Sequence, residues 1–273
     1  MGKSNPFKAL MADDASYKDK SVKLMMLTES GSYRLGEASR PNIYHDNGHL
    51  DKHSTREPTP ADRALFAGWV AALEASEAAR PWLVDAHSAY RHFLFGKGKD
   101  RRVAYDRYIA NDPAGQKLLK LVVADFIFHA EKIGENRKNF SLTSNVFGVG
   151  PGKFAPHPLT ENWVKTLGQH VFWVSATVIV SVNRESKIRM DAELLIRAED
   201  KYNFNPGDSD IATGIPDSAN GRFEVCGLAN QYMNYGEIRR MISWTKGVTD
   251  SVMVEGASSK VPDAPSDSRY GDR

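Results

Sequence analysis

The stretches QHVFWVSATVIVSVN (residues 169–183) and KIRMDAELLIRAE (residues 187–199) carry apolar side chains at every second position. In the first stretch, the even positions from 172 to 182 are all apolar. In the second, the apolar residues in phase are Ile188, Met190, Ala192, Leu194 and Ile196. A period of two is typical of β-strands with one buried face. Because the polar segment NRES joins the two stretches, the sequence predicts a long antiparallel hairpin.

The β-pattern continues beyond the hairpin. The stretch EIRRMISW (residues 237–244) has the same period and predicts a third strand. Before it, RFEVCGLANQYMNYG (residues 222–236) predicts a short helix that ends at Gly236. Residues 166–250 therefore predict an antiparallel, β-rich and barrel-like domain, and we expect any functional site to lie in it.

Helix signals dominate residues 58–145. Thr59 can cap a helix whose first residue is Pro60, and Asp62 three positions after the cap gives a variant of the capping box. A second start signal, Asp-Pro at 112–113, precedes a long apolar stripe with helical period. These signals predict helices that pack as a bundle or against another domain.

The predicted fold class is α+β, with an N-terminal helical domain followed by the antiparallel β-rich domain. The predicted order along the chain is an irregular segment (1–57), the helical domain (58–145), a linker (146–165), the β-rich domain (166–250) and a disordered tail (251–273).

Composition limits the classes of protein. With 41% hydrophobic and 26% charged residues among 273, the chain can bury a core. Its net charge of +2 gives no argument for nucleic-acid binding. The single cysteine, Cys226, allows no intrachain disulfide and is expected to be a small buried residue. No apolar run approaches the ~18 residues of a membrane span, and the first residues lack the apolar core of a signal peptide.

Three short motifs have alternative interpretations. The basic run GKGKDRR (residues 96–102) is typical of a solvated loop, the alternative being a contact with phosphate or anionic lipid. The segment HDNGHLDKH (residues 45–53) is typical of a solvated tail, the alternative being a divalent metal site. Residues 145–158 are rich in glycine, but Phe154 follows Lys153 where a phosphate loop needs Ser or Thr, so a linker is favoured.

The densest polar stretch is EDKYNFNPGDSDIATGIPDSANGRFE (residues 199–224), which follows the second predicted strand. Its candidate catalytic residues are Asp200, Tyr202, Asn203, Asp210 and Arg222, and its candidate metal ligands are Asp200, Asp208 and Asp210. Carboxylate oxygens suit Mg²⁺ or Ca²⁺, and an arginine can bind a phosphate through two hydrogen bonds. The set suits metal-assisted hydrolysis of a phosphoester or diphosphate. The alternative is two β-turns, with Arg222 in a structural salt bridge.

The order strand, Asp-x-Tyr-Asn-Phe-Asn-Pro, Gly-Arg, helix and strand resembles the activity domain of colicin M-type bacteriocins over about residues 165–245. Asp200 and Tyr202 match the motif of that family, Phe204 matches as a packing residue and Arg222 corresponds to its arginine. Asn203 stands where the family has a second Asp. No His follows in the loop, so Asp208 or Asp210 would have to replace it. The stretch is also similar to C-terminal modules of bacterial polymorphic toxins.

The resemblance implies an antibacterial toxin that cleaves lipid II between its undecaprenyl chain and pyrophosphate, aided by Mg²⁺. Asp200 would be the acid or a metal ligand, Tyr202 the substrate positioner, Asp210 a second carboxylate and Arg222 the phosphate clamp. The expected partners are a lipid-linked envelope precursor, an immunity protein and the membrane surface. We expect synthesis in the cytoplasm without a signal peptide and specialised secretion into the periplasm of a target cell.

Two other functions stay open from the sequence. A membrane-perturbing toxin without catalysis would use the apolar helix at 116–133 or the apolar strand face at 172–182, although a core role explains both. A non-catalytic binding or adaptor protein would use the polar stretch to hold a structural Ca²⁺.

Overall fold

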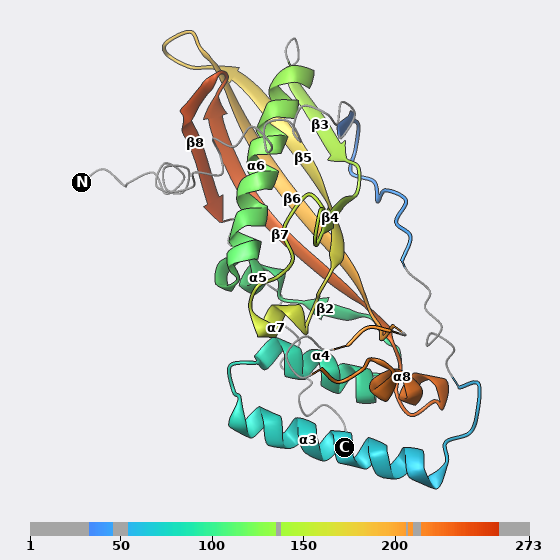
Figure 1. The fold of residues 1–273 in the computed structure, drawn as a ribbon. Coiled ribbons are helices and arrows are strands. Elements are labelled where there is room, and N and C mark those ends of the chain that lie inside the picture. Colours follow the sequence, from blue (N-terminus) through green and yellow to red (C-terminus); the bar gives the residue numbers. More distant parts are fainter. Residues whose placement is uncertain (1–32, 46–53, 135–137, 206, 210–213, 257–273) are drawn as a thin grey trace.

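The computed structural model describes residues 33–45, 54–134, 138–205, 207–209 and 214–256. Within these ranges, an eight-stranded sheet has the order β1-β3-β5-β6-β7-β2, with β4 added to β5 and β8 added to β7 (Figure 1). Helices and a mostly antiparallel sheet confirm the α+β class. The sheet is open rather than closed on itself, so it does not show the barrel-like shape that we predicted.

The predicted hairpin forms the centre of the sheet. Strand β5 (His170–Val182) pairs antiparallel with β6 (Ile188–Tyr202), and the register runs from Val182 opposite Ile188 to Val171 opposite Glu199. On the other side of β6, strand β7 (Tyr232–Thr245) pairs antiparallel along its whole length. Strand β8 (Val248–Gly256) returns along β7.

Four short strands extend this centre. They are β1 (Tyr33–Leu35), β2 (Arg101–Val103), β3 (Asn139–Ser144) and β4 (Phe147–Val149). β3 and β4 both pair antiparallel with β5, and β1 pairs antiparallel with β3. β2 is the exception, because it runs parallel to β7.

The local helix signals are confirmed. Helix α3 (Pro60–Ala79) has the Thr59 cap and the reciprocal capping box with Asp62. Helix α6 (Pro113–Ile133) starts at the Asp112 cap, whose carboxylate accepts a hydrogen bond from the backbone N–H of Ala114. The remaining helices are α4 (Val84–Phe95), α5 (Tyr105–Asn111), α7 (Glu161–Val164) and α8 (Ser218–Val225).

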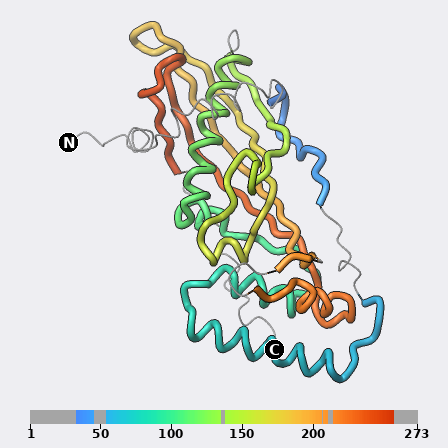
Figure 2. The backbone as a smooth tube through the Cα atoms, viewed as in Figure 1, coloured from blue at the N-terminus to red at the C-terminus, as the bar shows by residue number. Residues whose placement is uncertain are grey.

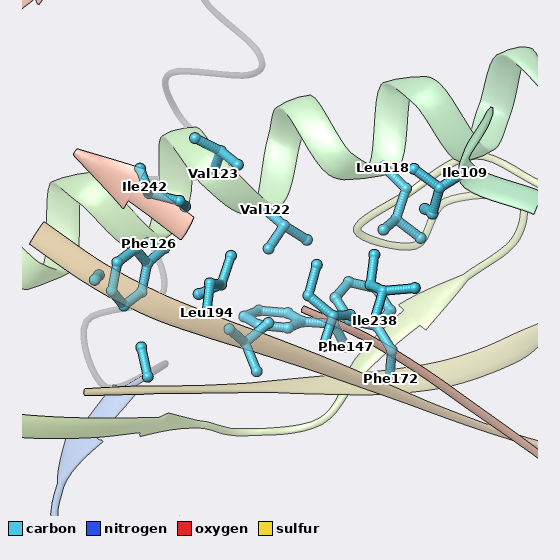
Figure 3. Close-up of a cluster of buried hydrophobic side chains, with 14 of the residues drawn as sticks. Ile109, Leu118, Val122, Val123, Phe126, Phe147, Phe172, Leu194, Ile238 and Ile242 are labelled. Carbon is cyan, nitrogen blue, oxygen red and sulfur yellow. The ribbon is translucent and has the colours of Figure 1, made fainter. Parts of the chain in front are cut away.

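Two hydrophobic cores result from this arrangement. In the larger core, α6 lies across one face of the sheet, where Leu118, Val122 and Phe126 pack over strand residues such as Leu194 (Figure 3). The smaller core joins α3, α4 and α8 at the end of the sheet that lies away from the β5–β6 turn (Figure 2). Cys226 lies in this smaller core and is 2% exposed, which confirms its buried position.

Some predicted boundaries are wrong. The helix expected to reach Gly236 ends at Val225, and β7 begins at Tyr232, because pairing with β6 fixes residues 232–236 in extended form. The expected linker contains β4 and α7. Residues 251–256 of the expected tail belong to β8, and the rest of that tail lies outside the described residues.

The helices give no candidate for a membrane span. Among the described residues, none combines the length and the apolar composition that crossing a bilayer requires.

The contact between α5 and α6 predicts a cost for a small change. A Cβ at Gly115 of α6 would lie 2.3 Å from the backbone oxygen of Tyr108. We expect Gly115→Ala to destabilise the protein by about 1–3 kcal/mol, since the backbone must shift. The matched control is Gly68→Ala in α3, where a Cβ meets nothing within 4 Å and stability should rise by up to about 1 kcal/mol. Urea unfolding measures both, and an unchanged Gly115→Ala variant would contradict the close packing.

Candidate functional site

A buried carboxyl lies near the end of β6, on the face that carries the core. Alternation along the strand brings Leu194, Ile196, Ala198 and then Asp200 to this face. Asp200 is 6% exposed, and its partner across the strand pair is Asn234 of β7. The amide Nδ2 of Asn234 donates to Asp200 Oδ2 at 3.0 Å and to the carbonyl of Thr166 at 3.3 Å. The Asn234 amide therefore holds the carboxyl at its Oδ2 atom.

A guanidinium continues this polar cluster. Arg101 of β2 lies opposite Asn234 in the parallel pairing, and its Nη1 donates to Asn234 Oδ1 at 3.2 Å. Its Nη2 donates to Ser88 Oγ of α4 at 3.1 Å. The basic run at 96–102 is therefore not simply a solvated loop, because Arg101 turns inward. The sequence analysis missed Arg101 because a three-residue strand is too short to show a period.

The environment changes the acidity of Asp200. Burial raises the pKa of its carboxyl to about 7, against the opposing effects of the Asn234 hydrogen bond and the Arg101 charge. Such a carboxyl exchanges its proton near neutral pH, which is the range that general acid–base catalysis uses. Among the candidate catalytic residues that the structure describes, Asp200 therefore has both a position and an acidity that suit catalysis.

The aromatic residues of the motif pack beside this carboxyl. Tyr202, two positions after Asp200, stacks on Tyr232 with ring centroids 5.0 Å apart. Tyr232 is 3% exposed, and its hydroxyl donates to the carbonyl of Ala89 at 2.8 Å. Phe204 packs against Phe93 of α4 with centroids 4.9 Å apart. These contacts tie the end of β6 to α4.

Arg222 makes a salt bridge with the helix cap of α3. Its Nη2 lies 2.8 Å from Asp62 Oδ1, and Asp62 also accepts hydrogen bonds from Arg56 and Thr59. These donors, Arg56 first, hold the pKa of the Asp62 carboxyl well below its usual range. The structure thus contains the salt bridge that the sequence left as an alternative, and Asp62, 160 residues away, is the partner.

The loop after β6 contains the hydrogen bonds of turns. Asn203 Nδ2 donates to Asn205 Oδ1 at 3.3 Å, and the backbone N–H of Asn205 donates to Asp217 Oδ2 at 3.1 Å. Asp208 is exposed, and its carbonyl accepts from the backbone N–H of Asp217. Asp210 lies outside the described residues.

Two of the predicted metal ligands, Asp200 and Asp208, lie in the described part of the chain, and they are not close together. Asp200 is buried on the inner face of β6, whereas Asp208 lies on an exposed turn. In the described ranges, no three His, Cys, Asp or Glu side chains are grouped to hold a metal ion. Of the histidine-rich segment, His45 contacts Glu199 at 3.2 Å, and residues 46–53 lie outside the description. The Mg²⁺ or Ca²⁺ requirement stays a prediction.

The chain matches no family model and no curated protein. The resemblance to colicin M-type bacteriocins therefore rests on the motif residues alone.

The raised pKa of Asp200 predicts a pH-dependent cost to stability. The folded protein keeps a proton that the unfolded chain releases near pH 4, so this residue destabilises the fold as pH rises from about 4 to about 7. Asp200→Asn removes the titration and should stabilise the protein at pH 8 by about 1–3 kcal/mol, with the gain shrinking toward pH 4. Urea unfolding at several pH values measures this. The exposed control Asp208→Asn should show no such trend, and a pH-independent effect of Asp200→Asn would contradict the assignment.

The Arg222 salt bridge predicts a structural effect. Arg222→Gln leaves the buried Asp62 with fewer donors and should lower the melting temperature by about 2–4 °C. The control is Arg239→Gln, whose salt bridge with Glu193 is half exposed on both sides and should change little. Loss of activity without a change in melting temperature would instead favour the phosphate-clamp role.

Proposed function

We propose that the protein is an antibacterial toxin that hydrolyses a phosphate-containing envelope precursor, at the undecaprenyl–pyrophosphate linkage of a lipid II-like substrate. The observation that supports this is Asp200, which is both the first residue of the motif and a buried carboxyl with a pKa of about 7. The motif suggests the substrate class, and the buried carboxyl supplies a group with suitable acidity. The motif and the acidity of the buried carboxyl both point to Asp200.

The chemistry that Asp200 can perform is proton donation. Hydrolysis adds water across the linkage, and the oxygen that leaves needs a proton. A neutral Asp200 would donate this proton from Oδ1 while Asn234 holds Oδ2 in place. The positive charge of Arg101, which lowers the pKa of Asp200, would then stabilise the carboxylate that remains.

The other motif residues have supporting roles in this proposal. Tyr202 would position the substrate next to Asp200, since its ring is fixed by stacking on Tyr232. Asp210 remains the proposed second carboxylate. Arg222 keeps 40% of its side chain exposed while it contacts Asp62, so a phosphate could reach it only as a shared partner.

The structure gives no support for the membrane-perturbing alternative. Leu118, Val122 and Phe126 of α6 are completely buried against the sheet, and Phe172, Val174 and Val178 of β5 face the same core. Their removal to a bilayer would expose the rest of that core to water. Their apolar character is explained by the fold, as the sequence analysis had favoured.

The remaining expectations belong to the same proposal. We place the action in the periplasm of a target cell after specialised secretion, with peripheral contact to the membrane that holds the substrate. A producing cell would need an immunity protein, and no partner of the nucleic-acid class is proposed.

The proposal predicts a specific loss in Asp200→Asn. Purified protein should release a water-soluble diphosphate product from lipid II, and the variant should lose at least about 100-fold in rate. In the wild type, the rate should fall as pH rises above about 7, because the acid is then deprotonated. Expression directed to the periplasm should kill cells, and cytoplasmic expression should not.

Controls make this test decisive. Asp208→Asn measures the effect of removing an exposed carboxylate from the same loop, and chelation with and without added Mg²⁺ tests the metal requirement. Full toxicity and full cleavage by a folded Asp200→Asn variant would reject Asp200 as the acid.

A further inference from the structure

The second face of the sheet carries a cleft of about 370 Å³. Four neighbouring strands, β5, β6, β7 and β2, contribute to it, and the side chains that matter for the argument are Arg102, Trp173, Arg197, Tyr235 and Glu237. Helix α6 packs on the opposite face, so this cleft is separate from the core and from the carboxyl of Asp200. A volume of this size suits a small molecule rather than a macromolecule.

The strand register arranges these side chains in two rows. Trp173 lies opposite Arg197, and Arg197 lies opposite Glu237, which forms the first row across β5, β6 and β7. In the next row, Tyr235 of β7 lies opposite Arg102 of β2. Because a sheet is a rigid support, these side chains are held at fixed spacings.

The arginines Arg197 and Arg102 of the cleft differ in whether their guanidinium groups are paired. Arg197 donates to Glu237 at 3.2 Å and to Ser175 at 3.0 Å, and its guanidinium lies 6.0 Å from the centre of the Trp173 ring. Arg102, in contrast, is exposed and makes no ion pair or hydrogen bond with any described residue. Its five N–H donors are therefore available to a ligand.

A second donor in the wall of the cleft also lacks an acceptor. Trp173 is 5% exposed, and its buried indole Nε1 has no hydrogen-bond partner within the described chain. A buried N–H without an acceptor is unfavourable, so a ligand oxygen that bonded to it would stabilise the complex. The Tyr235 hydroxyl adds a third donor, because a tyrosine keeps its proton at neutral pH.

The second row continues into β6 with a carboxylate that is already paired. Glu199 lies opposite Tyr235, is 1% exposed, and accepts two hydrogen bonds from Arg40 at 2.6 Å each. His45 contacts the same carboxylate at 3.2 Å. The Glu199 carboxylate is thus paired, and the acids that line the cleft itself are Glu237, which is paired with Arg197, and Asp100.

We propose that this cleft binds a small phosphate-bearing ligand, with Arg102 as the principal donor and Trp173 and Tyr235 as additional donors. The three donors come from β2, β5 and β7, and the several oxygens of a phosphate group can accept from more donors than the two oxygens of a carboxylate can. The site is distinct from that of the proposed hydrolysis and does not require it.

Titration of the full chain with pyrophosphate and with glucose 1-phosphate tests the proposal, followed by calorimetry and by tryptophan fluorescence. We expect saturable binding at sub-millimolar concentration, weakened at least tenfold by Arg102→Gln and about threefold to tenfold by Trp173→Phe, which keeps the ring but removes the N–H. Arg184→Gln, an exposed arginine in the β5–β6 turn, is the matched control and should bind as the wild type does.

The outcomes separate this site from the catalytic proposal. Asp200→Asn should bind both phosphates normally, because Asp200 lies on the other face of the sheet. The proposal fails if neither phosphate binds saturably, if Arg102→Gln binds them as tightly as the wild type, or if acetate binds as tightly as pyrophosphate. Loss of binding in Asp200→Asn would also overturn it, since the cleft would then not be a separate site.

Discussion

The pairing of β6 with β5 on one side and β7 on the other is the constraint on which both sites depend. Side chains alternate along β6, so Asp200 faces the core and Glu199 faces the opposite surface. A shift of one residue in register would exchange the two faces and place the carboxylate of Glu199 among the core side chains. Twelve residue pairs between β5 and β6 and fourteen between β6 and β7 resist that shift.

Burial of Asp200 beside the apolar core is unfavourable for its charged form, and its polar neighbours offset part of that cost. Ionising Asp200 inside the protein is unfavourable, which is why its pKa is raised to about 7 rather than left near its usual value. Asn234 and Arg101 reduce this cost without removing it, because the effect of burial on the carboxyl is larger than the effects of the amide hydrogen bond and the guanidinium charge. An Asn or a Leu at position 200 would avoid the cost of ionising a buried carboxyl. This unresolved cost is what distinguishes Asp200 from the fully paired Asp62.

The sequence predicted what local patterns determine and missed what long-range contacts determine. The hairpin and the caps at Thr59 and Asp112 were predicted because their signals lie within a few residues. The salt bridge of Arg222 was left as an alternative without a partner, because Asp62 lies 160 residues earlier. The strand start at Tyr232 was missed because local propensity favoured a helix, whereas pairing with β6 decided the conformation. Arg101 was missed for the same reason, since β2 exists only through its pairing with β7.

Strand β2 connects the two faces of the sheet. Arg101 and Arg102 are consecutive, so one points to the Asp200 cluster and the other to the cleft. Both positions depend on the same parallel pairing of three residues with Asn234, Tyr235 and Gly236. Gly236 permits this arrangement, because a Cβ there would lie 2.9 Å from the side chain of Tyr105 beneath it. A basic run that resembles a loop in the sequence therefore becomes a short edge strand that supplies one guanidinium to each site.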